Sequence, residues 1–165
     1  MIPMENKLLD LFARLSRAAM RSRLYAMRAR KDTRPELERF FLALADSQAM
    51  QAQRFLMQVR GTVGATHENE QTAFTVELPA AIEEYEKLLQ EAEQLGNRAL
   101  TTGFSHGAEV DRLIIELRDT LGDRPEDTDY YVCDFCGYIA VDEPPDNCPV
   151  CTAPKNRFKK SGAAA

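Results

Sequence analysis

The sequence contains no tryptophan, only two histidines and only four cysteines among its 165 residues. It has no apolar run close to the roughly 18 residues that a membrane-spanning helix needs, which argues against membrane insertion. Its first residues also lack the basic segment followed by an apolar stretch that is typical of export signals. We therefore expect a cytoplasmic protein whose cysteines stay reduced.

Acidic residues outnumber basic ones, 26 to 21. The net charge of -5 argues against a nucleic-acid partner, because binding phosphates requires a positive surface. The charge is unevenly distributed, since arginine and lysine dominate residues 14–60 and acids dominate residues 68–93. Four arginines recur at helical spacing and form one stripe, namely Arg14, Arg17, Arg21 and Arg28. This stripe is either a solvated face or a docking strip for an acidic partner or a neighbouring subunit.

Apolar residues recur with helical spacing in four long stretches, at residues 6–30, 33–61, 74–95 and 97–121. The stretches join through short connections, except for the polar residues 61–72, which we interpret as a crossover between helix pairs. Four long helices with one longer connection predict a four-helix bundle.

Several residues mark the expected helix ends. Thr33 offers an N-cap hydroxyl, and Pro35 and Glu36 follow it at the positions that favour the start of a helix. Pro79 is expected in the first turns of the third helix or at a kink in it, and Gly96 is expected to cap its end. These signals predict where the second helix begins and where the third one ends.

Helical spacing stops at residues 122–129, which contain glycine, proline and four acids and are typical of a linker. We predict a bundle domain over residues 1–124 and a small β domain over residues 125–165. The second part is too short to bury a sizeable core and needs a cross-link, such as a bound metal ion, to be stable.

The four cysteines can supply that cross-link by binding a metal ion. Cys133 and Cys136 form one CxxC pair and Cys148 and Cys151 form another, with eleven residues between the pairs. Two such turns can place four thiolates around one tetrahedral metal ion. The ion is either a structural zinc or an iron that cycles between two oxidation states, and the spacing alone does not separate them. No cysteine remains for nucleophilic chemistry.

Two segments carry a family resemblance, residues 131–138 (YVCDFCGY) and residues 148–154 (CPVCTAP), followed by Phe158. They resemble the rubredoxin-like tail of rubrerythrins, which favours iron at the four cysteines. Rubrerythrins place a ferritin-like four-helix bundle before this tail, and the whole chain follows that order. Bundle positions that fit are Leu8, Leu9, Ala13, Ser16, Arg54, Phe55, Thr66, Glu68, Asn69 and Gly96.

The resemblance also implies where a di-iron centre would be held, on glutamates and histidines that point into the bundle. Most of those positions carry other residues here: Leu15, Gln48, Gln51, Ala80 and Ile114. Glu77 and Asp111 are the two carboxylates that remain, and neither His67 nor His106 matches a ligand position. Two close dications need several anionic ligands, so we predict that the di-iron centre is absent.

We therefore predict a non-enzymatic electron-transfer protein with one iron on four cysteines, a redox protein as partner and a homodimeric assembly. One alternative is a peroxide-reducing enzyme with a relocated metal site on Glu77, Asp111, His106 and Glu109, in which His106 and Glu109 share a helix face. The other alternative is a structural interaction module whose tail carries zinc.

Overall fold

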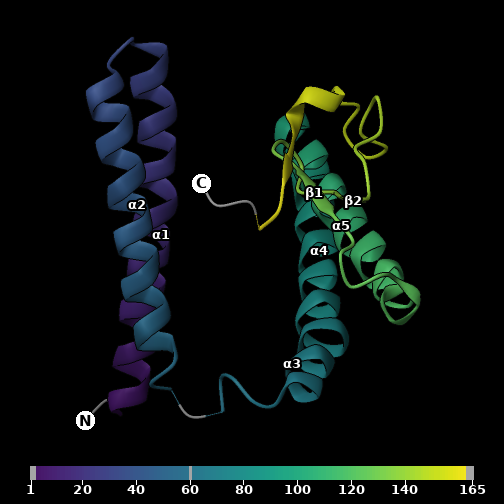
Figure 1. The fold of residues 1–165 in the computed structure, drawn as a ribbon, viewed down its shortest axis with the longest axis horizontal. Coiled ribbons are helices and arrows are strands. Elements are labelled where there is room, and N and C mark those ends of the chain that lie inside the picture. The colour runs from purple at the N-terminus through teal and green to yellow at the C-terminus, as the bar shows by residue number, and fades with distance from the viewer. Residues whose placement is uncertain (1–2, 60, 163–165) are drawn as a thin grey trace. The chain divides into compact units, whose positions relative to one another are not determined.

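The computed structural model describes residues 3–59 and 61–162 of the chain. Its main elements are α1 (Met4–Lys31), α2 (Pro35–Leu56), α3 (Thr66–Thr72), α4 (Leu78–Gln94), α5 (Arg98–Arg118), β1 (Tyr130–Cys133), β2 (Ile139–Val141) and β3 (Phe158–Lys160). Figure 1 shows long paired helices and one small sheet, so the predicted mainly α class with a small β part is confirmed. Within the described ranges no helix is both long and apolar enough to cross a membrane.

The chain divides into two compact units, one ending at Ala65 and the other beginning at Thr66. The first unit is the α1–α2 helix pair. The second combines α3, α4 and α5 with the three strands. The domain boundary predicted at residue 124 stays a prediction.

The first unit has a core of small side chains. Five buried alanines line the contact between its helices: Ala19, Ala26, Ala29, Ala45 and Ala52. Small side chains let two helices approach to the short end of the usual interaxial range. Arg23 pairs with Asp46 at 2.9 Å and Arg30 with Glu38 at 2.6 Å across the two antiparallel helices.

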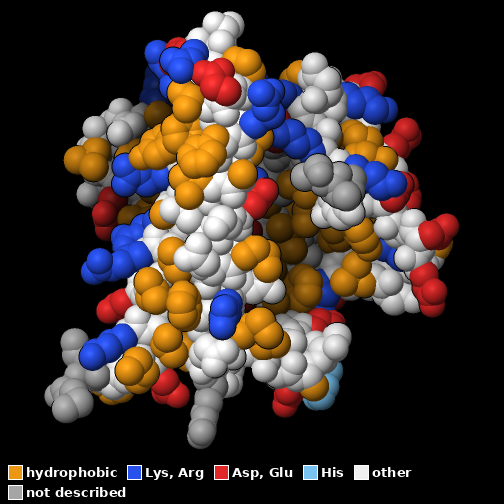
Figure 2. Space-filling model, turned by 60° about the vertical axis from the view of Figure 1, so that its left-hand side comes forward, with side chains coloured by type: hydrophobic (Ala, Val, Ile, Leu, Met, Phe, Trp, Pro, Cys, Tyr) orange, Lys and Arg blue, Asp and Glu red, His pale blue; other side chains and the backbone are white. Residues whose placement is uncertain are grey.

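The outer faces of this pair expose large apolar side chains, which appear in Figure 2 among lysines and arginines. Every methionine in the described ranges is more than half exposed: Met4, Met20, Met27, Met50 and Met57. Methionine is usually buried, and exposed methionines are common on adaptable binding surfaces. The first unit therefore presents apolar surface in addition to its basic stripe.

Thr33 does not cap α2, so that prediction is wrong. Its φ of +53° places it in the left-handed region, where it ends α1 in a Schellman motif. The amide of Thr33 donates to the Arg30 carbonyl at 3.1 Å, and the amide of Arg34 donates to the Ala29 carbonyl at 2.9 Å. Glu36 pairs with Arg34 at 2.6 Å instead of completing a capping box. Pro35 begins α2, as predicted.

Replacing Thr33 by glycine should stabilise the protein, because a β-branched residue is strained at this φ and glycine is not. We expect Thr33→Gly to raise the free energy of unfolding by about 1 kcal/mol in a denaturant titration. Gly96 ends α4 in the same motif, with a φ of +65° and donation from Asn97 to Ala92 at 3.0 Å. The matched variant Gly96→Thr should change stability in the opposite direction, and equal signs would contradict this account.

Helical structure in the second unit begins at Thr66, before the start predicted for the third helix near residue 74. The segment expected to be a crossover contains α3, and a π-helical turn over Ala73–Glu77 joins it to α4. The amide of Leu78 donates to the carbonyl of Ala73, and Pro79 occupies the first turn of α4. Because proline offers no N–H, the change in helical winding falls at the proline, where sequence analysis placed a kink.

The ring of Tyr85 on α4 lies against Gly107 of α5 where these two helices pack. A Cβ atom on Gly107 of α5 would lie 2.9 Å from Cζ of Tyr85 on α4, whereas one on Gly103 would meet nothing within 4 Å. Asn97 caps α5 by accepting a hydrogen bond from the Leu100 amide at 3.3 Å. Gly107 is thus the position on α5 that allows the close approach of Tyr85.

These two glycines give a matched pair of substitutions. Gly103→Ala should stabilise α5 by about 1 kcal/mol, because alanine is the better helix former and its methyl group meets open space. Gly107→Ala adds the same helix propensity but displaces the Tyr85 ring, so we expect it to be about 1–3 kcal/mol less stable than Gly103→Ala. Thermal and denaturant unfolding of both variants would measure the difference, and equal stabilities would count against close packing of Tyr85.

The β part is a three-stranded antiparallel sheet in the order β2-β1-β3. Tyr131 of β1 pairs with Ala140 of β2, and Cys133 pairs with Phe158 of β3. The predicted linker is short and includes a 3-10 turn at Leu121–Asp123. The first cysteine turn lies between β1 and β2, and the second lies between β2 and β3.

Candidate metal centre

The two CxxC segments form turns with the same hydrogen bonds. In the first, the Cys133 amide donates to Tyr138 at 2.9 Å and the Cys133 carbonyl accepts from Gly137 at 2.9 Å. In the second, the Cys148 amide donates to the carbonyl of Ala153 at 2.8 Å and its carbonyl accepts from Thr152 at 2.9 Å. The sequence folds in this way because each turn has a residue in the left-handed region four positions after its first cysteine.

The residues at that position differ between the turns. Gly137 has a φ of +89°, which glycine adopts at little cost, whereas Thr152 has a φ of +61°. Sequence analysis did not single out Thr152, because a threonine in a CxxC segment gives no sign of a left-handed backbone. The equal spacing of Gly137 and Thr152 from their cysteines is the signal that could have found it.

The four sulfur atoms converge on one point. Sγ of Cys133 lies 3.7 Å from Sγ of Cys151, and Sγ of Cys136 lies 3.6 Å from Sγ of Cys148. All four lie within 4.8 Å of one another. A tetrahedral ion with metal–sulfur bonds near 2.3 Å requires sulfur–sulfur edges of about 3.8 Å. The predicted ligands are therefore positioned to bind one metal ion.

Burial and hydrogen bonds divide the thiols into two kinds. Burial raises the pKa of Cys136 far above the ordinary thiol range, and burial also raises the pKa of Cys151. Burial acts in the same direction on Cys133, but hydrogen bonds from the amides of Cys136 and Phe135 outweigh it and lower the pKa of that thiol. These amides also stabilise the thiolate charge that a bound metal requires.

The surroundings of the site are partly apolar. Tyr138 and Phe158 meet edge to face, with ring centroids 6.4 Å apart. A methyl group placed on Gly137 would lie 4.0 Å from Cγ1 of Val110, a buried residue of α5. Phe135, between the first two cysteines, is instead 66% exposed. The first cysteine turn thus lies close to helix α5 on one side and presents an aromatic ring to solvent at Phe135.

The positions where the resemblance implies bundle ligands carry neutral side chains with other contacts. Gln48 accepts a hydrogen bond at 3.0 Å from the hydroxyl of Ser22, which is 3% exposed. Gln51 donates to Ser47 at 3.3 Å. Leu15 and Ile114 are half-buried, and Ala80 is exposed. Ser22 was missed by sequence analysis, since its role depends on a partner 26 residues away.

The residues named for a relocated site do not form a ligand cluster in the second unit. Glu77 is exposed at the end of the π-helical turn, and Glu109 lies 3.6 Å from the Arg112 guanidinium. His106 is half-buried, and burial raises the pKa of Asp111. Across residues 3–59 and 61–162, the four cysteines form the one group of three or more histidine, cysteine or acidic side chains that is arranged to hold a metal.

Comparisons with known proteins agree with this geometry. Residues 131–159 match the rubredoxin-like domain of rubrerythrin. Rubrerythrin-2 of Clostridium acetobutylicum is 26% identical, and the match covers 87% of this chain and 89% of that protein. Nigerythrin of Nitratidesulfovibrio vulgaris is 28% identical over 45% of this chain and 38% of its own length. The solved structure of mixed-valence nigerythrin matches with a TM-score of 0.52 at 19% identity, covering 97% of this chain and 87% of that one, which supports a common fold.

Proposed function

Because this chain is a rubrerythrin-like protein with a four-cysteine, rubredoxin-like site, we propose that it transfers single electrons through one iron bound there. The observation that carries the proposal is the convergence of the four sulfur atoms at tetrahedral spacing. Iron on four thiolates changes its coordination little between its two charges, and amides near the sulfurs tune its potential. The residues that would hold the ion are Cys133, Cys136, Cys148 and Cys151.

We also propose that the helical part carries no di-iron pair. Two neighbouring dications need anionic ligands to offset their repulsion, and Leu15, Gln48 and Gln51 offer none. The hydrogen bond between Gln48 and the buried Ser22 supports the proposal, because it commits the amide oxygen to a neighbouring side chain. Peroxide reduction by a relocated site is the weaker alternative, since its four residues are not gathered into one cluster in the second unit.

Metal analysis with a visible spectrum tests both proposals. Protein purified without oxygen should contain about one iron per chain, be red when oxidised and lose its colour on reduction. About three irons per chain would overturn the proposed absence of the di-iron centre. A colourless protein with one zinc would overturn electron transfer and favour the structural module.

The redox partner and the homodimer are proposals as well. The exposed Phe135 lies next to two ligands, which suits a docking face where an electron enters or leaves over a short distance. The exposed apolar side chains of α1 and α2 support an assembly of two chains. Light scattering at micromolar concentration should give the mass of a dimer, and a monomeric mass would count against this proposal.

A further inference from the structure

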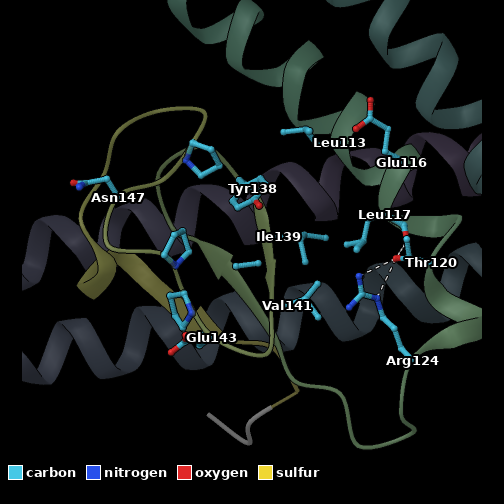
Figure 3. Close-up of a pocket in the computed structure, with 14 residues that line it drawn as sticks. Leu113, Glu116, Leu117, Thr120, Arg124, Tyr138, Ile139, Val141, Glu143 and Asn147 are labelled. Atoms are coloured by element: carbon cyan, nitrogen blue, oxygen red, sulfur yellow. Dashed lines mark hydrogen bonds between the residues drawn. The ribbon is translucent and has the colours of Figure 1, made fainter.

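A cavity of about 630 Å³ lies beside the metal site within the second unit. One wall carries Leu113 and Leu117 of α5 and Thr120 just after its end, and the other comes from the tail and carries Tyr138, Ile139 and Val141 (Figure 3). This volume is in the range of small-molecule sites, which are mostly apolar with a few polar groups that fix the ligand. Neither the proposed electron transfer nor the metal ligands account for the cavity.

The cavity is lined by apolar side chains on both walls, with polar and charged side chains among them. Pro144, Pro145 and Pro149 line it together with residues of the tail strands. Proline rings and leucine side chains favour a planar apolar body through contact area. The shape and lining therefore suit an aromatic or conjugated ring.

Arg124 places a positive charge at one end of the cavity. Arg124 is half-buried, and its Nε and Nη2 groups donate to Thr120 Oγ1 at 3.1 and 2.8 Å. In the described part of the chain no carboxylate lies within ion-pairing distance of Arg124, whereas Arg118 of α5 is paired with Glu70 at 3.0 Å. The threonine thus orients a guanidinium that keeps free donors for an anionic group.

The acidic residues of the cavity do not occupy that end. Figure 3 shows Glu116 and Glu143 on other sides of the cavity from the Arg124 guanidinium, which is turned toward Val141. Glu143 is largely exposed and lies 3.8 Å from the Lys155 ammonium. The position for an anionic group is therefore at Arg124.

We infer that this cavity binds a planar organic anion, with its carboxylate, sulfonate or phosphate on Arg124 and its ring between the α5 leucines and the prolines. The ligand would lie close to the metal, because Tyr138 follows Cys136 by two residues and Asn147 and Pro149 flank Cys148. The inference does not depend on iron, so it is distinguishable from the proposed function and can be tested on the zinc-loaded protein.

The experiment uses full-length metal-loaded protein and two dyes that share one ring system. 8-Anilinonaphthalene-1-sulfonate carries an anionic group, and N-phenyl-1-naphthylamine lacks it. Fluorescence titration should show binding of the sulfonate at least about tenfold tighter than that of the neutral dye, since a charge-assisted hydrogen bond contributes this much. Equal affinities, or no binding of the sulfonate, would overturn the proposal.

Substitutions then locate the site. Arg124→Gln should weaken binding of the sulfonate about tenfold and leave the neutral dye unaffected, and Arg124→Lys should restore part of the loss. Arg54→Gln is the matched control, because Arg54 borders an exposed apolar surface with Met50 and Met57 where dyes could bind non-specifically. Metal content and melting temperature report whether each variant is folded. An unchanged affinity in Arg124→Gln, or an equal loss in Arg54→Gln, would refute the assignment.

Discussion

Cys148→Ser should lose its metal and the folded structure of the tail. Apparent binding free energies of about 10–16 kcal/mol for four-ligand sites average about 3–4 kcal/mol per ligand, so removing one thiolate should lower metal affinity by two to three orders of magnitude. The tail has few other sources of stability, since Cys133, Cys148 and Ala140 are its fully buried side chains among the described residues. Metal content after desalting and circular dichroism of the tail would measure both effects.

The control is Thr152→Ser in the same turn. Thr152 is exposed, and its hydroxyl donates to the carbonyl of Cys151, a bond that serine can also make. This variant should keep one metal ion per chain. Retention of metal in Cys148→Ser would mean that three cysteines suffice and would contradict the ligand assignment.

Metal affinity should fall steeply as the pH falls. A metal ion binds the thiolate, and burial raises the pKa of both Cys136 and Cys151, so these thiols keep their protons at neutral pH in the metal-free fold. Binding therefore displaces at least two protons. We expect the affinity to decrease about a hundredfold for each pH unit below neutrality, because each displaced proton contributes a factor of ten.

Competition with a chromophoric chelator at two pH values, with zinc as the probe ion, would measure that slope. The lowered pKa of Cys133 acts in the other direction, since a thiol that ionises more easily releases less of a proton on binding. A decrease of less than tenfold per pH unit would show that the buried thiols are not protonated in the metal-free protein.

The sequence predicted well those features that depend on short-range spacing. The four cysteines, the Gly96 helix end and Pro35 at the first position of α2 are local signals, and each has its expected place in the structure. The prediction for Thr33 was wrong because a threonine between two helices can cap the second helix or end the first one. The three-residue connection between α1 and α2 favours the second outcome.

Features that depend on long-range contacts were not predictable. The Ser22–Gln48 hydrogen bond requires the register of two helices, and the left-handed Thr152 requires the fold of the second cysteine turn. Arg124 likewise appeared only as a linker residue, because its lack of an acidic partner is visible only when the neighbouring chain segments are placed. The predicted absence of a di-iron centre is different. It rests on the neutral residues Leu15, Gln48 and Gln51 and on the family resemblance, which are both read from the sequence.

The contact between Gly137 and Val110 has a consequence for the dynamics of α5. Because the first cysteine turn lies against this helix, loss of the ion frees one side of α5 as well as the tail. Hydrogen–deuterium exchange at the α5 amides around Val110 should therefore be slower in the loaded protein than in the chelated one, while exchange in the separate α1–α2 unit should be unchanged. The helix would in this way report whether the ion is present.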